Sequence, residues 1–211
     1  MKSARPLLIS FEGIDGSGKS TQCKMLYHEL IDRGFVVHLY REPGGTRISE
    51  KIRNILLDRE NMEMSPVTEM LLYFASRNQL ISEKVVPALK KGEIVLLDRF
   101  VDSTIAYQGY GRNLSLESIQ KVADVAIGTV TPDLTILVDT PLETAEDRME
   151  DRDLDRLEAE NVEFKLRTKN GYLKLAEADS HRFLVLDGRD SIDTLKRTVL
   201  TRIDQLLDSS V

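Results

Sequence analysis

Five short runs of branched apolar residues are spaced along the chain. Each run is almost continuously apolar instead of alternating with polar positions, which is typical of strands buried on both faces of a parallel sheet. Longer segments with helical spacing separate them. The runs cover residues 7–11, 36–40, 94–97, 134–138 and 183–186. Strands that alternate with helices predict an α/β domain whose parallel sheet is covered by helices on both faces.

Two of the helical segments have clear boundary signals. Apolar residues recur at helical spacing from Cys23 to Leu30, and Gly34 supplies a stop signal. Pro66 opens a second helix that runs towards Pro87. Because no internal repeat or Pro/Gly-rich linker marks a boundary, the whole chain, residues 1–211, is expected to form one domain.

Composition and charge narrow the class of protein. Hydrophobic residues make up 41% of the 211 residues, enough for a substantial core. The single cysteine, Cys23, excludes an intramolecular disulfide, and we expect it to be a small core residue of a cytoplasmic protein. The net charge of −6 has the wrong sign for a broad nucleic-acid interface. No apolar run approaches the ~18 residues of a membrane span, so neither nucleic acid nor membrane is an expected partner.

Each apolar run ends in a charged residue, and these are Glu12, Arg41, Asp98, Asp139 and Asp187. Open α/β sheets bind ligands at the carboxyl ends of their strands, so the charges favour a binding site there. The alternative, that any buried strand must end in something polar, stays open on position alone.

The segment after the first run decides between them. Residues 13–20 read Gly-Ile-Asp-Gly-Ser-Gly-Lys-Ser, which matches G-x-x-x-x-G-K-[ST] between a predicted strand and a predicted helix. Glycines allow backbone N–H groups to surround an anion, Lys19 is expected to reach the β- and γ-phosphates, and the Ser20 hydroxyl to bind Mg²⁺. We predict an ATP site with Mg²⁺. Its expected nucleotide-binding residues are Gly13, Ile14, Asp15, Gly16, Ser17, Gly18, Lys19, Ser20 and Thr21.

Three further strings identify the kind of phosphate-loop protein. Residues 41–46 read Arg-Glu-Pro-Gly-Gly-Thr, residues 98–100 read Asp-Arg-Phe, and residues 103–112 read Ser-Thr-Ile-Ala-Tyr-Gln-Gly-Tyr-Gly-Arg. Together with Phe-Glu-Gly-Ile-Asp-Gly at 11–16, they closely resemble the thymidylate kinase family, the enzymes that phosphorylate dTMP to dTDP. The resemblance implies a P-loop NTPase fold with a five-stranded parallel sheet, helices on both faces and a helical lid, in a chain that acts as a homodimer.

The resemblance also implies an acceptor site. Phe74 is similar to the ring that stacks on thymine, and Arg77, at i+3 on the same helix face, to the residue that hydrogen-bonds the base. Thr104 and Gln108 fall where the family reads the pyrimidine edge. Tyr107 falls where a ring disfavours a 2′-hydroxyl.

The charged groups of the predicted site follow from the same likeness. Arg99 and Arg41 resemble the residues that hold the acceptor phosphate, Asp98 the carboxylate that orients Mg²⁺ with Ser20, and Asp15 a carboxylate between the substrates. A phosphate monoester is already largely dianionic at pH 7, since its second pKa is ~6. Catalysis therefore requires converging cations and alignment, and no general base.

The remaining cations are expected from the lid, at about residues 143–157. Some relatives have an arginine in the phosphate loop where this chain has Gly16, whereas others place catalytic arginines in the lid. Arg148, Arg152 and Arg156 have four-residue spacing, which predicts one helical face. Arg148 resembles the residue that packs against adenine, and Arg152 is expected to contact the transition state, so that the predicted catalytic residues are Asp15, Lys19, Arg99 and Arg152.

Two other functions remain open from sequence. A deoxynucleoside kinase shares the phosphate loop, but its acceptor is a hydroxyl group and would need a carboxylate as general base. Two arginines for an acceptor phosphate would have no role in such an enzyme. A nucleotide-binding regulatory module is the other possibility, and intact Lys19, Ser20, Asp98 and Arg99 argue against it.

Overall fold

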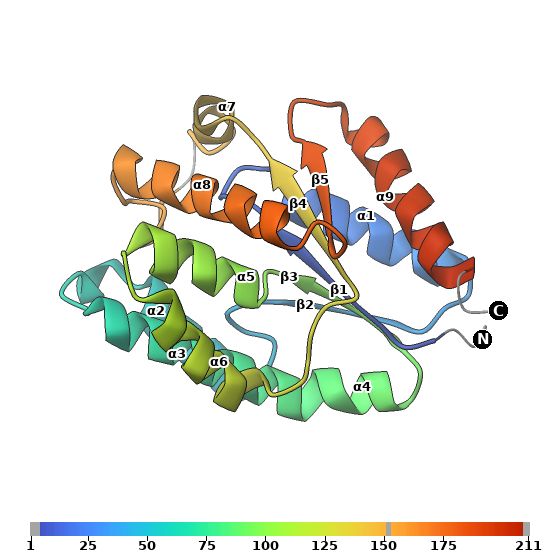
Figure 1. The fold of residues 1–211 in the computed structure, drawn as a ribbon, viewed down its shortest axis with the longest axis horizontal. Helices are drawn as coiled ribbons and strands as arrows, with labels where there is room; N and C mark the ends of the chain where they lie inside the picture. The colour runs from blue at the N-terminus through green and yellow to red at the C-terminus, as the bar shows by residue number, and fades with distance from the viewer. Residues whose placement is uncertain (1–4, 151–152, 209–211) are drawn as a thin grey trace.

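One parallel sheet organises the molecule. The computed structural model describes residues 5–150 and 153–208. Its strands are in the order β2-β3-β1-β4-β5, and every neighbouring pair is parallel (Figure 1). They are β1 (Leu7–Glu12), β2 (Val37–Arg41), β3 (Ile94–Asp98), β4 (Leu134–Asp139) and β5 (Phe183–Asp187). Each predicted run is confirmed as a strand, and the predicted α/β class is confirmed.

Helices and helical turns connect the strands. They are α1 (Lys19–Asp32), α2 (Arg47–Leu57), η1 (Arg59–Asn61), α3 (Pro66–Leu80), η2 (Ile81–Val85), α4 (Val86–Lys90), α5 (Val101–Thr104), η3 (Ile105–Gly111), α6 (Leu116–Ile127), α7 (Leu142–Asp147), α8 (Val162–Ala178) and α9 (Ile192–Asp208). Ser65 caps α3 by accepting from the amide of Thr68, and Pro66 fills the first helical position. The π-helical turn η2 carries the helix on into α4, which contains Pro87.

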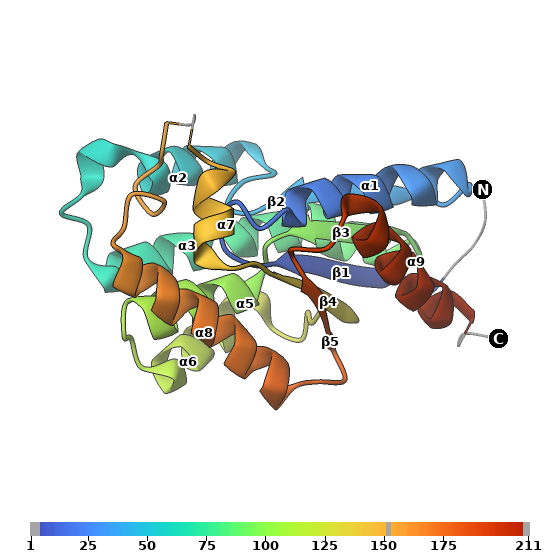
Figure 2. The ribbon, with the colours of Figure 1, turned by 90° about the horizontal axis from the view of Figure 1, so that it is seen from above.

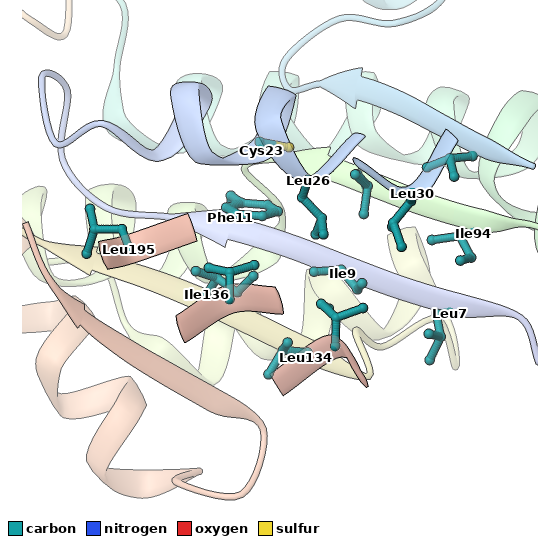
Figure 3. Close-up of a cluster of buried hydrophobic side chains, with 14 of the residues drawn as sticks. Leu7, Ile9, Phe11, Cys23, Leu26, Leu30, Ile94, Leu134, Ile136 and Leu195 are labelled. Carbon is teal, nitrogen blue, oxygen red and sulfur yellow. The ribbon is translucent and has the colours of Figure 1, made fainter. Parts of the chain in front are cut away.

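Each face of the sheet packs on its own set of helices. Helices α1 and α9 cover one face, where Cys23, Leu26 and Leu30 meet alternate residues of β1, β3 and β4 (Figure 3). Cys23 is 1% exposed and burial raises the pKa of its thiol, as expected of a core residue. On the other face lie α3, η2 and α4, with η3 and α8 alongside (Figure 1). The carboxyl ends of the strands stay free of these layers.

The single helical face predicted for the lid arginines is wrong. Helix α7 ends at Asp147, and residues 153–159 form turns and irregular backbone, so Arg148 and Arg156 do not share a helical face. Arg152 lies outside the described residues. One local and one distant contact favour the turns: the Asp155 carboxylate accepts from the amides of Leu157 and Glu158, and the amide of Arg156 donates to Leu57 in α2. None of the described helices is long and apolar enough to cross a membrane.

Candidate active site

The phosphate loop connects β1 to α1 through three glycines with positive φ. They are Gly13 (139°), Gly16 (76°) and Gly18 (97°), conformations that side chains with a Cβ rarely adopt. A Cβ on Gly13 would lie 2.6 Å from the carbonyl oxygen of Val138, so the loop passes directly against β4. The resulting turn leads into the N-terminus of α1, where free N–H groups favour an anion.

Helix α7 closes over this loop (Figure 2). A Cβ on Gly16 would lie 2.1 Å from the carbonyl oxygen of Ala145 in α7. Arg148, just beyond the helix, donates from Nη1 to the carbonyl oxygens of Gly16 and Ser17 at 3.3 Å, and from Nη2 to that of Gly188 at 3.0 Å. Arg148 therefore bridges the phosphate loop and the connection between β5 and α9.

Three charged side chains meet beside the loop. Arg99 donates to Asp15 at 2.6 Å, and the Lys19 ammonium lies 3.6 Å from the same carboxylate oxygen. Burial opposes ionisation of Asp15, but Arg99 and Lys19 hold its pKa well below the usual range. Burial, with Arg99 nearby, lowers the pKa of Lys19. The cluster carries one net positive charge, in a position to face an anion.

The backbone of Arg99 is itself unusual. Its φ is 77°, an uncommon value for a residue other than glycine and of a kind that gathers at functional sites. The guanidinium is fixed by the Gly13 carbonyl at 2.9 Å, the Tyr107 hydroxyl at 3.1 Å and the Tyr172 hydroxyl at 3.1 Å. Tyr107 also donates to Asp15 at 2.8 Å. These bonds hold the cation rigidly at the end of β3.

A buried acid supports this arrangement from below. Glu12, the last residue of β1, is fully buried and accepts from the Phe100 amide at 2.7 Å and from the hydroxyls of Ser103 and Tyr172 at 2.6 and 3.0 Å. Burial, together with the nearby carboxylate of Asp102, raises the pKa of Glu12 to about 7.

A cavity of about 450 Å³ opens at the carboxyl ends of the strands, between the phosphate loop and the segments α5 and η3. Its volume is in the range of small-molecule sites. Most of the predicted site residues lie on its wall: Asp15, Gly16, Gly18, Lys19, Ser20, Thr21, Arg41, Asp98, Arg99, Thr104, Tyr107, Gln108 and Arg148. Gly13, Ile14 and Ser17 belong to the loop behind them.

Comparison with known proteins decides the family. The family model described as thymidylate kinase matches residues 11–199. The thymidylate kinase of Caldanaerobacter subterraneus is 46% identical over 203 residues, covering 96% of this chain and 97% of the relative. That of Thermoanaerobacter sp. (strain X514) is 48% identical over 197 residues, 90% and 97% of the two chains. The chain belongs to the thymidylate kinase family.

Solved structures agree with the assignment to this family. The crystal structure of thymidylate kinase from Ehrlichia chaffeensis superposes with a TM-score of 0.79 at 33% identity, covering 94% of this chain and 98% of that one. The predicted P-loop NTPase fold is thereby confirmed. Neither alternative, the deoxynucleoside kinase or the regulatory module, gains support.

The residues present fit the magnesium ion that thymidylate kinases use with ATP. Ser20 and Asp98 both line the cavity, and each presents an oxygen, the ligand type that Mg²⁺ prefers. Asp98 Oδ1 is buried and has no hydrogen-bond partner among the described residues. An orphaned carboxylate oxygen on the cavity wall is suited to a metal ion or to the water molecules around it.

Phe74 is a correction to the acceptor site expected from the family. Its ring is 2% exposed and packs with Met70, Ile119 and Ala123 beneath α6, so it cannot stack on a ligand in the cavity. Its neighbour Tyr73 is the α3 ring that lines the cavity. Tyr73 and Phe74 both lie within a helical turn or so of Arg77, and only the tertiary packing distinguishes them.

Arg77 also lies behind the cavity wall. It is 1% exposed, and it donates to Glu42 at 2.6 Å, to the Thr104 hydroxyl at 2.9 Å and to the Phe100 carbonyl at 3.0 Å. Because Thr104 lines the cavity, Arg77 reaches the site through that hydroxyl. A direct contact between Arg77 and the base stays a prediction.

Arg53 is a cavity residue that sequence reasoning missed. It lines the cavity from α2 and donates to the Pro43 carbonyl at 2.9 Å. Burial and the nearby Arg41 lower its pKa. A signal was available: Arg53 follows the buried Ser49 at i+4, so both occupy the inner face of α2.

Proposed function

We propose that this cavity is where the chain transfers the γ-phosphoryl group of ATP to dTMP, giving dTDP and ADP. The observation that carries the proposal is that the phosphate loop forms one wall of the cavity and Arg99, Tyr107 and Gln108 form the other. Asp15 and Lys19 of the loop meet Arg99 of the other wall in one ion-pair cluster. A donor phosphate and an acceptor phosphate would therefore meet at the same charged cluster.

The donor side consists of the loop and the residues around it. The backbone amides of residues 13–21 would hold the phosphates, Lys19 would pair with the β- and γ-phosphates, and Arg148 would pack against adenine near Gly188. Ser20 and Asp98 would hold Mg²⁺, which neutralises phosphate charge when bound.

The acceptor side is provided by β2, α2, α3, η3 and the segment from Arg99 through α5. Arg99, Arg41 and Arg53 would hold the phosphate of dTMP, since guanidinium groups bind such oxygens bidentately. Tyr73 replaces Phe74 as the ring proposed to stack on thymine. Thr104 and Gln108 would meet the base edge.

One acceptor-side contact addresses the sugar. The ring of Tyr107 would stand against the sugar, and its hydroxyl donates to Asp15 at 2.8 Å. Because this bond limits movement of the ring, we infer that Tyr107 disfavours a 2′-hydroxyl.

The cluster beside the phosphate loop supplies little positive charge for a phosphoryl group in transfer. Lys19 and Arg99 share one carboxylate, Asp15, so only one net positive charge comes from that cluster. We therefore retain Arg152 as the residue that contacts the transferring phosphoryl group. It lies outside the described residues, and its assignment rests on the family likeness.

We also propose that the protein is cytoplasmic, as its single cysteine suggests. We propose further that it forms a homodimer, because apolar side chains lie uncovered on three helices of one side. They are Ile48 and Ile55 of α2, Val67 and Leu71 of α3, and Leu116 and Val125 of α6. Val125 is 85% exposed. A second copy covering α3 and α6 would bury this surface.

Sedimentation of the protein and of Leu71→Asp would test the homodimer. The unchanged protein should be a dimer and the variant a monomer.

A panel of acceptors assayed with ATP and Mg²⁺ tests the reaction. dTMP should be phosphorylated fastest, with dUMP, dCMP and dGMP slower and thymidine inert. Preference for thymidine would favour the deoxynucleoside kinase, and no turnover with any acceptor would favour the regulatory module.

A further inference from the structure

Glu69 is a fully buried acid that no part of the proposed reaction uses. It belongs to α3 and is 0% exposed. One oxygen accepts from the Gln108 side-chain amide at 2.8 Å and from Arg112 Nε at 3.2 Å. The other accepts from Arg112 Nη2 at 3.0 Å and lies 2.7 Å from Arg156 Nη1. The carboxylate thus joins the end of η3, through Gln108 and Arg112, to Arg156.

The contact with Gln108 has a consequence for the cavity. An ionised carboxylate only accepts hydrogen bonds, so Gln108 must direct its NH₂ group towards Glu69. Its Oε1 then points away from Glu69, and no donor among the described residues bonds to it. Gln108 lines the cavity although it is only 1% exposed, so this oxygen would be the acceptor that it offers to a ligand there.

The Glu69 side chain is held as an ionised carboxylate. Burial opposes its ionisation, but the hydrogen bonds from Arg112 and Gln108 lower its pKa below the usual value. Arg112 is also paired with Glu160 at 2.5 Å, and Arg156 Nε donates to the Leu56 carbonyl at 2.8 Å. The same network therefore fixes the carboxylate in position.

We propose that Glu69 is a positioning residue for base selection: it locks the Gln108 amide so that a hydrogen-bond acceptor faces the pyrimidine. Thymine carries a hydrogen on N3 and can donate to Oε1, whereas N3 of cytosine carries a lone pair and repels it. The orientation therefore selects dTMP against dCMP. This inference rests on the proposed function, because it assumes that the pyrimidine meets Gln108.

Glu69→Gln tests the lock with the least change in shape. A glutamine can present either its oxygen or its NH₂ to Gln108, so the Gln108 amide is no longer held in one orientation. The ratio of kcat/KM for dTMP to that for dCMP should fall at least about tenfold, the effect expected when a site built to pair with one hydrogen-bonding pattern loses that pairing. A merely structural role would reduce both values by the same factor and leave the ratio unchanged.

Two further variants separate the lock from a general weakening of the network around Glu69. Arg112→Lys weakens the same network without touching Gln108, so it should lower thermal stability while the ratio stays constant. In a Gln108→Leu background, Glu69→Gln should cause no additional change in the ratio, since it acts through Gln108. If Glu69→Gln alone does not fold by circular dichroism, the pair Glu69→Gln with Arg156→Gln removes one charge of each sign and is measured instead.

The outcomes distinguish this inference from the proposed function. A ratio that stays within twofold in the folded Glu69→Gln protein, or effects that add in the double variant, would overturn the positioning role alone. Failure of the unchanged protein to phosphorylate dTMP would overturn the proposed function itself.

Discussion

Arg99 Nη2 donates to Asp15 Oδ1 over 2.6 Å, joining the end of β3 to the phosphate loop. The guanidinium is also bonded to a loop carbonyl and to two tyrosine hydroxyls. The proposed acceptor-binding cation is therefore held in place before any substrate arrives. Such preorganisation lowers the cost of bringing two phosphates together.

Arg99→Ala should chiefly damage use of the acceptor. Loss of a charge-assisted contact costs about 1.5–3 kcal/mol, which corresponds to roughly a 10- to 150-fold fall in kcat/KM for dTMP. Steady-state kinetics with varied dTMP measures it. The matched control is Arg33→Ala, an arginine paired with Glu29 and Asp204 away from the cavity. Equal kinetics in both variants would remove Arg99 from the site.

Gly16→Ala should lower kcat by more than the backbone strain of an alanine at positive φ can explain. Gly34 provides the control, since its φ is +89° but a Cβ there meets nothing within 4 Å. Gly34→Ala should lose about 1–2 kcal/mol of unfolding free energy and keep turnover. In Gly16→Ala, the clash with Ala145 shifts α7 or the loop, and a shift of about 1 Å can cost roughly 10²-fold in kcat.

The same contact answers whether an arginine at position 16 could supply the missing cation. With α7 seated as it is, the Ala145 carbonyl occupies the space that any Cβ needs. Gly16→Arg should therefore fail to restore a variant that lacks a lid arginine. Turnover recovered by Gly16→Arg would show that α7 moves freely.

The strands and the phosphate loop could be predicted because their signals are local. A continuous apolar run predicts a buried strand, and the glycine-rich string predicts a phosphate loop, without reference to the rest of the chain. The charged strand ends show the limit of such reasoning. Arg41 and Asp98 do line the cavity, and Glu12 lies beneath it. Asp139 and Asp187, however, pair with Lys169 and Arg189.

The errors concern tertiary packing. Helical spacing allows either Tyr73 or Phe74 to share a face with Arg77, and the position of α6 over Phe74 decides between them. The four-residue spacing of the lid arginines likewise predicts a helix, but the contacts of Arg156 with α2 and Glu69 favour turns. The contacting residues in α2, α3 and α6 are far from Phe74 or Arg156 in the sequence or are placed only by the fold, so the local spacing of residues cannot predict these contacts.

Tyr73→Ala should affect dTMP binding, whereas Phe74→Ala should affect stability. Loss of the Tyr73 ring should raise KM for dTMP while the fold persists, since removing a ring that stacks on a base costs about 1–3 kcal/mol. Phe74→Ala leaves a cavity in the core and should lower the unfolding free energy by about 3–5 kcal/mol. Thermal unfolding and kinetics on both proteins test the pair. A stable Phe74→Ala with weak dTMP binding would reinstate Phe74 as the stacking ring.

Glu12 should make stability depend on pH between about 4.5 and 7. Burial raises its pKa from 4.5 to about 7, so in this interval the folded protein holds a proton that the unfolded chain has released. The folded state binds more protons, and unfolding free energy therefore falls as pH rises, by up to roughly 3 kcal/mol. Above pH 7 the contribution is constant. Urea unfolding at pH 5 and pH 8 should show this fall for the parent but not for Glu12→Gln, and parallel behaviour of the two would contradict the raised pKa.

The three lid arginines should separate into three phenotypes, because the structure places two of them in different surroundings. Arg156 is 2% exposed and paired with Glu69, so Arg156→Ala should cost about 3 kcal/mol of stability, as when a buried ion pair loses one partner. Arg148 is exposed beside the phosphate loop, and Arg148→Ala should raise KM for ATP with a smaller effect on kcat. Arg152→Ala should lower kcat by ~10³–10⁵, as expected of an arginine finger supplied in cis, and leave both KM values nearly unchanged. Single-turnover rates at saturating ATP and dTMP isolate this effect from binding. If Arg152→Ala stays within a few-fold of the parent, the transferring phosphoryl group is stabilised by Lys19, Arg99 and Mg²⁺ without the lid.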